Sequence, residues 1–202
     1  MVLAGQFLER PALVDAGGLV LEGLFHRGRR RPSLLVCPAP GPGGGMDAPP
    51  VAELAWAAAR AGHASLRFNH RGAGASQGEP DPSRALDDAR AALAHLAATA
   101  RPPLAIAGVG AGCATALALA AADGCAALVL VAPEALSAGV PAGLRTLAIL
   151  PERGGRTTPE DVRAALGPLG KVEVVEGADP LFLAGLPAVG RLAVGFLEPG
   201  AS

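Results

Sequence analysis

Short apolar runs recur along the chain, and each has glycine, proline or a charged residue within three positions of both ends. Such runs predict strands buried on both faces of a parallel sheet, and they occur at residues 33–37, 64–68, 104–107, 127–131, 144–150 and 172–175. Residues 18–26 alternate apolar and polar positions instead, which predicts a half-buried strand. Residues 11–15 are its expected hairpin partner. The chain is therefore expected to begin with two antiparallel strands and to continue with parallel ones.

Helical segments lie between these strands. They are predicted at residues 51–61 with Gly62 as the cap, from Asp81 or Ser83 to about residue 98, after Gly112, from Thr158-Pro159-Glu160, and at residues 186–197. Strands that alternate with helices predict a mostly parallel sheet with helices on both faces. No repeat or linker interrupts the pattern, so residues 1–202 are expected to form a single α/β domain.

The same pattern predicts whether several large or polar side chains lie in the core or in solvent. Trp56 in the first helix and Phe68 in the strand after it are expected in the core. Asp87, Asp88 and His95 are expected on an exposed face of the second helix, and we assign them no chemistry.

The segment at the centre of the chain, residues 103–122, combines a strand, three glycines on alternate positions and an alanine-rich helix. This order is typical of a nucleophile elbow, in which a tight turn presents a serine above a parallel sheet. The central position of the turn is Gly110, which has no side chain that could attack a carbonyl. The sequence therefore predicts the shape of the elbow without its chemistry.

Composition and charge exclude several classes of function. The formal net charge is −1, and the one basic cluster, at residues 27–31, lacks the interleaved aromatic residues of a nucleic-acid site. No apolar stretch predicts a membrane span or a signal peptide, so we expect a cytoplasmic protein. Cys37, Cys113 and Cys125 lack metal or disulfide spacing, and we expect reduced thiols and neither metal nor cofactor.

Several motifs, in order along the chain, resemble those of small, nearly capless bacterial α/β-hydrolases. The most specific is ASLRFNHRGAGASQG at residues 64–78, which resembles the LRFNFRGxGxSxG segment of that family. Residues 37–44 resemble its HPHPxxGG motif, residues 108–113 its GxSFGG elbow, residues 131–133 its vaPP segment and residues 177–182 its GADHFF segment. The resemblance covers nearly the whole chain. It implies a three-layer α/β-hydrolase fold with a minimal cap, and a catalytic triad of serine, acid and histidine.

The chain departs from that family at each triad position. The serine position is Gly110 and the histidine position is Pro180. The acid position, counted back from Pro159, falls on Gly155, although Glu152 and Asp161 lie nearby. All four histidines of the chain precede residue 96, whereas the family order places the base last. No standard triad is therefore expected.

Other residues near the predicted sheet edge have structural or alternative roles. Cys37 ends one buried strand and His70 follows the next, and we keep this pair as an alternative nucleophile and base. Cys113 is expected to point into the core. Arg71 and Ser76 are expected to brace the glycine-rich loop, with Arg71 bonded to loop carbonyls and to a carboxylate such as Asp47.

Backbone groups remain at the elbow even without the triad. The N–H groups of Ala39, Gly41, Gly43 and Ala111 are expected to edge an oxyanion-like pocket at Gly110. The main hypothesis is a pseudoenzyme that uses this pocket for a small acyl or anionic ligand, or uses its surface for a protein partner or homo-oligomer. The alternative is an esterase- or thioesterase-type hydrolase with an unorthodox nucleophile such as Cys37.

Overall fold

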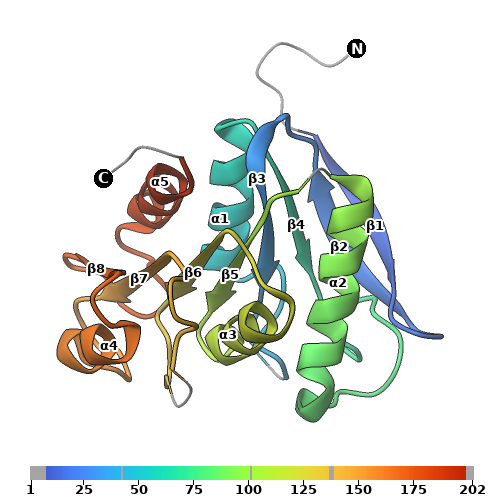
Figure 1. Cartoon of the computed structure of the whole chain (residues 1–202). Coiled ribbons are helices and arrows are strands. Elements are labelled where there is room, and N and C mark those ends of the chain that lie inside the picture. Colours follow the sequence, from blue (N-terminus) through green and yellow to red (C-terminus); the bar gives the residue numbers. More distant parts are fainter. Residues whose placement is uncertain (1–7, 42, 101, 137–138, 199–202) are drawn as a thin grey trace.

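A central sheet with helices on both faces forms the framework of this computed structural model, which describes residues 8–41, 43–100, 102–136 and 139–198 (Figure 1). The strands are β1 (Glu9–Asp15), β2 (Val20–His26), β3 (Arg30–Cys37), β4 (His63–Phe68), β5 (Leu104–Val109), β6 (Ala127–Val131), β7 (Thr146–Pro151) and β8 (Gly170–Val175). The helices are α1 (Pro49–Arg60), α2 (Ala85–Thr99), α3 (Gly112–Asp123), α4 (Pro159–Leu166) and α5 (Leu186–Leu197), with a 3₁₀ turn at Pro82–Arg84.

The eight strands of the described sheet lie in the order β1-β2-β4-β3-β5-β6-β7-β8. β1 pairs antiparallel with β2, and β2 antiparallel with β4, whereas every later pair is parallel. The predicted hairpin and the predicted parallel sheet are both confirmed. In this register Cys37 lies beside Gly108, and Val109 beside Val131, so β3, β5 and β6 end at one edge of the sheet.

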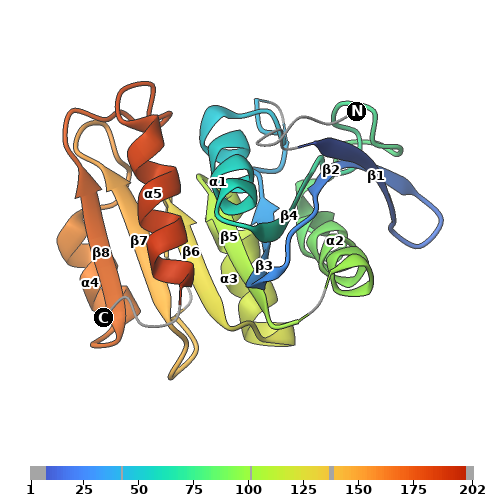
Figure 2. The same ribbon diagram turned by 90° about the horizontal axis from the view of Figure 1, so that it is seen from above.

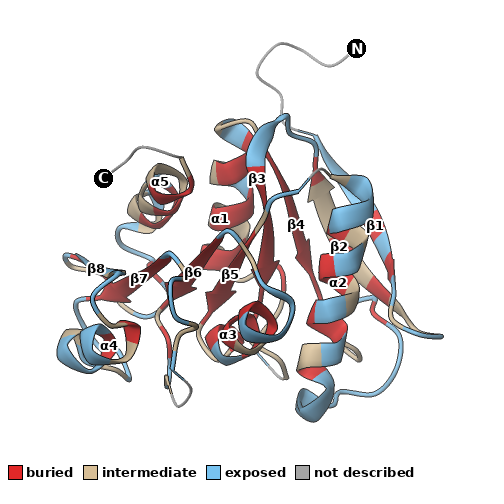
Figure 3. Ribbon diagram, viewed as in Figure 1, coloured by how far each residue is buried: buried red, intermediate tan, exposed pale blue. Residues whose placement is uncertain are grey.

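Two apolar layers flank the sheet. α1 and α5 cover one face, and α2, α3 and α4 cover the other (Figure 2). The central strands are buried along most of their length (Figure 3). Alanine, valine and leucine supply most of this core, and Phe68 and Phe182 are its largest fully buried side chains. The expectation that Phe68 belongs to the core is confirmed.

Two expectations about single side chains are wrong. Trp56 is 43% exposed on α1, because it lies on the side of the helix away from the sheet. Asp88 is fully buried on α2, although it was expected in solvent. The guanidinium of Arg71, on the loop after β4, donates hydrogen bonds to the Asp88 carboxylate. These bonds replace those that the carboxylate would form with water. Asp87 is exposed and His95 half-buried.

Two of the three elbow glycines are required by close packing. A Cβ on Gly108 would lie 2.6 Å from the Cα of Cys113, and one on Gly112 would lie 2.5 Å from the carbonyl oxygens of Cys37 and Pro38. Real Cβ atoms do not approach backbone that closely, so α3 lies against β5 and the end of β3 only because these positions lack side chains. The beginning of α3 is thereby fixed over the carboxyl edge of the sheet.

Candidate ligand-binding site

The turn between β5 and α3 has the backbone shape of a nucleophile elbow. Gly110 has φ +58°, in the left-handed region, and its N–H donates to the carbonyl of Val131 at 2.9 Å. A sharp turn of this kind projects its central residue above the sheet edge. The shape predicted from the sequence is therefore present, and the central residue contributes only backbone.

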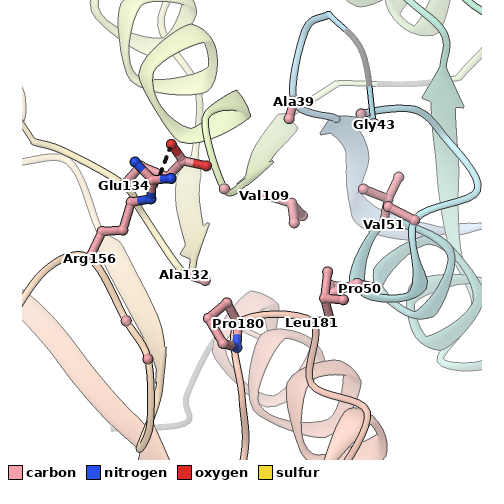
Figure 4. A pocket seen from close by; sticks show the side chains of 15 residues that line it. Ala39, Gly43, Pro50, Val51, Val109, Ala132, Glu134, Arg156, Pro180 and Leu181 are labelled. Carbon is pink, nitrogen blue, oxygen red and sulfur yellow. Dashed lines mark ion pairs between the residues drawn. The ribbon is translucent and has the colours of Figure 1, made fainter.

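A pocket of about 220 Å³ opens directly above this turn. Its lining is mainly apolar and glycine-rich, and consists of Ala39, Gly43, Gly44, Ala48, Pro50, Val51, Val109, Gly110, Ala132, Glu134, Gly154, Gly155, Arg156, Pro180 and Leu181. Figure 4 shows Ala39 and Gly43 on one side of the cavity, Pro180 and Leu181 on the other, and the Val109 side chain between them.

The three positions that the family resemblance assigns to the triad all line this one pocket. They are Gly110 after β5, Gly155 after β7 and Pro180 after β8. Segments distant in sequence therefore converge at one place on the sheet edge. Of the described residues that line the pocket, none is a serine, cysteine or histidine.

The predicted ligand-pocket residues divide into two groups. Ala39, Gly43 and Gly110 line the cavity, whereas Gly41 and Ala111 do not. Gly41 directs its carbonyl inside its own loop, where it accepts the N–H of Gly44 at 3.1 Å. Ala111 directly precedes the first turn of α3. The backbone N–H groups at the beginning of a helix have no hydrogen-bond partner within the helix.

Two charged side chains at the pocket were not singled out from the sequence. Glu134 lies beside Gly110: a Cβ on that glycine would be 3.6 Å from Glu134 Oε1. Arg156 pairs with Glu134, with 3.8 Å between Nε and Oε2 (Figure 4). Glu134 directly follows Val131-Ala132-Pro133 at the end of β6. This position, just past the carboxyl end of a buried strand, was the only signal in the sequence that could have pointed to it.

The backbone beside Gly110 is strained. Ala132 has φ +46°, and its N–H donates to the carbonyl of Ile149 at 2.9 Å. A non-glycine residue in this region costs of order 1 kcal/mol, and such residues concentrate at active sites and ligand-binding sites. The pocket floor thus consists of two adjacent left-handed residues, Gly110 and Ala132, from neighbouring strands.

Cys37 and His70 do not face this pocket. The Cys37 side chain is fully buried, and burial raises the pKa of its thiol to about 12. His70 is also buried, with Nε2 lying 3.3 Å from the carbonyl oxygen of Pro38 and Nδ1 3.5 Å from Oδ2 of Asp88. A neutral, inaccessible thiol is a poor nucleophile, so the geometry gives this pair no advantage. Cys113 is buried in the core as expected.

Residues at the end of β4 and just after it fix the loop that forms one wall of the pocket. Arg67 donates to the carbonyl of Met46 at 2.6 Å and to Asp47 at 2.9 Å. The side-chain oxygen of Asn69 accepts the N–H of Met46 at 2.8 Å. Together with His70 at the carbonyl of Pro38, these residues hold both ends of the loop between β3 and α1.

The expected partner of Arg71 was wrong. Asp47 pairs with Arg67, whereas Arg71 binds Asp88 through its backbone N–H and its guanidinium. The reason is direction, because the Arg71 side chain extends toward α2 rather than toward the loop after β3. Ser76 does brace the glycine-rich loop as expected: its hydroxyl donates to the carbonyl of Asn69 at 2.8 Å and accepts the N–H of Glu22 at 2.9 Å.

Two kinds of feature, metal-ligand clusters and membrane-spanning helices, are absent from the described part of the chain. Within the described ranges, no three potential metal-ligating side chains gather at one place. No helix among the described residues has the length and apolar character needed to cross a bilayer.

The sheet order, the elbow and the pocket at its edge define an α/β-hydrolase fold. The sequence model of the serine aminopeptidase S33 family matches residues 39–154, more than half of the chain, and the chain belongs to this family of hydrolases. No curated protein matches the sequence.

Solved structures of similar fold include the following three bacterial proteins. An alpha-beta serine hydrolase homologue from Coxiella burnetii is 24% identical with a TM-score of 0.80, and the match covers 98% of this chain and 100% of that one. A putative alpha/beta hydrolase from Agrobacterium tumefaciens is 22% identical with a TM-score of 0.78, covering 94% of each chain. A serine hydrolase without lid from Xanthomonas campestris is 21% identical with a TM-score of 0.78, covering 97% of this chain and 95% of that one. At these identities the likeness concerns the fold.

Proposed function

We propose that the protein is a non-catalytic member of its family that binds a small acyl-bearing ligand in the pocket above Gly110. The observation that carries the proposal is the convergence of Gly110, Gly155 and Pro180 on one open, mainly apolar cavity of about 220 Å³. Acyl transfer requires a nucleophile and a base that act as a unit. No serine, cysteine or histidine is among the described lining residues, whereas the space for a ligand is present.

The chemistry of the lining supports a short acyl chain. Val51, Val109 and Leu181 offer apolar surface, and the loop glycines let backbone approach a carbonyl group closely. Phe182 is fully buried in the core and does not line the cavity. Glu134 and Arg156 stand at the cavity as the polar groups that would orient a ligand.

Catalysis is tested directly by assaying the purified protein against short-chain p-nitrophenyl esters and thioesters, beside Cys37→Ala and Glu134→Gln. We expect no turnover above the rate in buffer from any of the three proteins. Turnover that Cys37→Ala abolishes would establish the alternative hydrolase with an unorthodox nucleophile. Turnover that depends on Glu134 would equally overturn the non-catalytic proposal, by making that carboxylate a base for water.

Binding is tested with a pair of matched substitutions. Val109→Phe places a phenyl group in the cavity, whereas Val174→Phe makes the same change at a β8 valine that is 43% exposed and outside the pocket. The probes are butyrate, butyramide and p-nitrophenyl butyrate, followed by ligand-observed NMR. We expect binding to the wild type and to Val174→Phe, and its loss in Val109→Phe. Equal binding by all three proteins would exclude this pocket as the site.

A further inference from the structure

A second concave surface lies between α1 and α5, on the outer side of one helical layer. Figure 2 shows the two helices side by side over the same face of the sheet. A trough of about 460 Å³ runs between them, and it shares no lining residue with the pocket above Gly110. We call it the α1–α5 trough. Its main lining residues are Glu53, Trp56, Ala57 and Arg60 from α1, and Pro187, Gly190, Arg191 and Val194 from α5.

The spacing of these residues shows that each helix presents one continuous stripe. Both sets follow the pattern i, i+3, i+4, i+7, which places four residues on one helical face. The floor of the trough is made of small residues: a Cβ on Gly190 would lie 2.7 Å from the Cβ of Ala57, so the helices touch there. The larger side chains of each stripe stand above this floor.

Trp56 is the dominant apolar group of the trough. It is the only tryptophan of the chain, and 43% of it is exposed. The guanidinium of Arg60 lies over its ring, with 4.7 Å between Cζ and the ring centre. Exposed tryptophan and arginine side chains are the residue types most enriched at the energetic centres of protein interfaces. The trough therefore has the composition of a contact surface.

The charges of the trough are arranged with opposite signs at its two ends. Glu53 lies toward the beginning of α1 and Arg60 ends that helix, and Arg191 lines the trough from α5. Among the described residues, none forms an ion pair with Glu53, Arg60 or Arg191. Burial raises the pKa of the half-buried Glu53 carboxyl, and the charge of Arg60 on the same helix acts in the opposite direction. These charged groups are therefore able to form ion pairs with a binding partner.

We propose that the α1–α5 trough binds the same trough of a second copy of this chain, about a two-fold axis that passes near Trp56. Glu53 and Arg60 are about 10 Å apart along α1, at 1.5 Å rise per residue, with Trp56 between them. A two-fold axis at Trp56 sets Glu53 of one copy against Arg60 of the other. The pairing then occurs twice, which is the property of a self-complementary interface.

The test is self-association of the full chain, measured by light scattering after size exclusion and by sedimentation from low micromolar to millimolar protein. We expect a concentration-dependent dimer. The emission of the single tryptophan reports the same event, because burial of Trp56 shifts it to shorter wavelength as the dimer forms. A monomer at all these concentrations would overturn the proposal. So would tryptophan emission that does not depend on concentration, since a segment of the same chain would then cover the trough.

Charge reversal decides whether the partner is a second copy. Arg60→Glu should weaken self-association by about tenfold or more, because it sets like charges opposite one another twice. Glu53→Arg combined with Arg60→Glu should restore the dimer, which an interface with a different acidic protein could not do. The control is Arg10→Glu, an exposed arginine of β1 outside the trough, which should self-associate as the wild type does.

Milder variants keep the proposal testable if the double reversal does not fold. Glu53→Gln and Arg60→Gln preserve side-chain shape and remove one charge each, and both should weaken self-association several-fold. Circular dichroism confirms the fold of each variant. Glutamine variants that both dimerise as strongly as the wild type would overturn the proposed pairing. A folded double reversal that stays monomeric would overturn it as well.

Discussion

Gly110 occupies a backbone conformation that glycine adopts freely and a serine adopts only with strain. Its φ is +58°, and the nearest atom to a built Cβ is Glu134 Oε1 at 3.6 Å, so conformation and not space opposes a side chain. We expect Gly110→Ser to lower the free energy of unfolding by about 1 kcal/mol. We also expect no ester hydrolysis, with or without Pro180→His, because the acid position is Gly155.

The matched control is Gly43→Ser in the neighbouring loop. Gly43 has φ +81° and nothing within 4 Å of its built Cβ, so it carries the same backbone strain away from the elbow. Urea denaturation should give similar losses of stability for both variants. Hydrolysis of p-nitrophenyl butyrate by Gly110→Ser alone would show that a base remains near the elbow.

Asp88 is the residue whose buried charge most affects stability. Burial alone would raise the pKa of its carboxyl, but His70 and Arg71, which face it, lower that pKa to about 2. Because the folded pKa is depressed, the stabilisation is present above the ordinary value of 3.8 and is lost as the pH falls toward 2. The shift corresponds to about 2 kcal/mol.

Asp88→Asn should therefore be less stable than the wild type near neutral pH, and the difference should shrink as the pH falls below 4. Unfolding in urea at a series of pH values measures it. Asp87→Asn is the control: Asp87 is the adjacent, exposed residue of α2 and pairs only with exposed arginines, so its loss should change stability little. A difference between Asp88→Asn and the wild type that does not vary with pH would contradict this account.

At the scale of the elements, α5 contains two glycines in opposite situations. A Cβ on Gly190 would lie 2.3 Å from Glu53 Oε1 and 2.7 Å from the Cβ of Ala57, whereas a Cβ on Gly195 would meet nothing within 4 Å. Gly195→Ala should raise the free energy of unfolding by about 0.5–1 kcal/mol through helix propensity. Gly190→Ala should lower it, because the contact with α1 must open. Thermal unfolding of the two variants compares them, and equal effects would show that α1 and α5 are not closely packed at Gly190.

The elements themselves were largely predictable from local patterns. α5 begins and ends where the apolar periodicity predicted it, at Leu186 and Leu197. α4 begins after Thr158, whose hydroxyl accepts the N–H of Asp161 at 3.1 Å, as the Thr-Pro-Glu segment indicated. These features depend on neighbours in sequence, which a linear pattern contains.

Contacts between distant segments could not be predicted in the same way. Asp88 was expected in solvent because an acid in the first turns of a helix usually faces water, and its partner Arg71 lies on a different segment. Trp56 was expected in the core because of its size, but its face of α1 is away from the sheet. Glu134 and Arg156 were missed because their relation to Gly110 exists only after β6 and β7 lie side by side.

At the scale of the whole molecule, the three thiols differ in access to solvent. Cys37 and Cys113 are fully buried, with pKa values raised by burial, whereas Cys125 is half-buried at the end of α3. We expect a thiol reagent such as dithionitrobenzoate to modify Cys125 slowly in the folded protein. Cys37 and Cys113 should react only when the protein unfolds in guanidinium. Rapid modification of Cys37, identified by mass spectrometry of the folded protein, would contradict its burial and reopen the alternative hydrolase.

The contacts of Arg67, Asn69 and His70 with the loop between β3 and α1 have a consequence for protein engineering. They hold that loop from the side away from the cavity, and none of them involves Gly110, Gly155 or Pro180. The geometry of the cavity and the identity of its reactive side chains are therefore separable. A designer could install a new nucleophile and base on this scaffold while leaving the supporting shell unchanged, because that shell does not depend on the residues to be replaced.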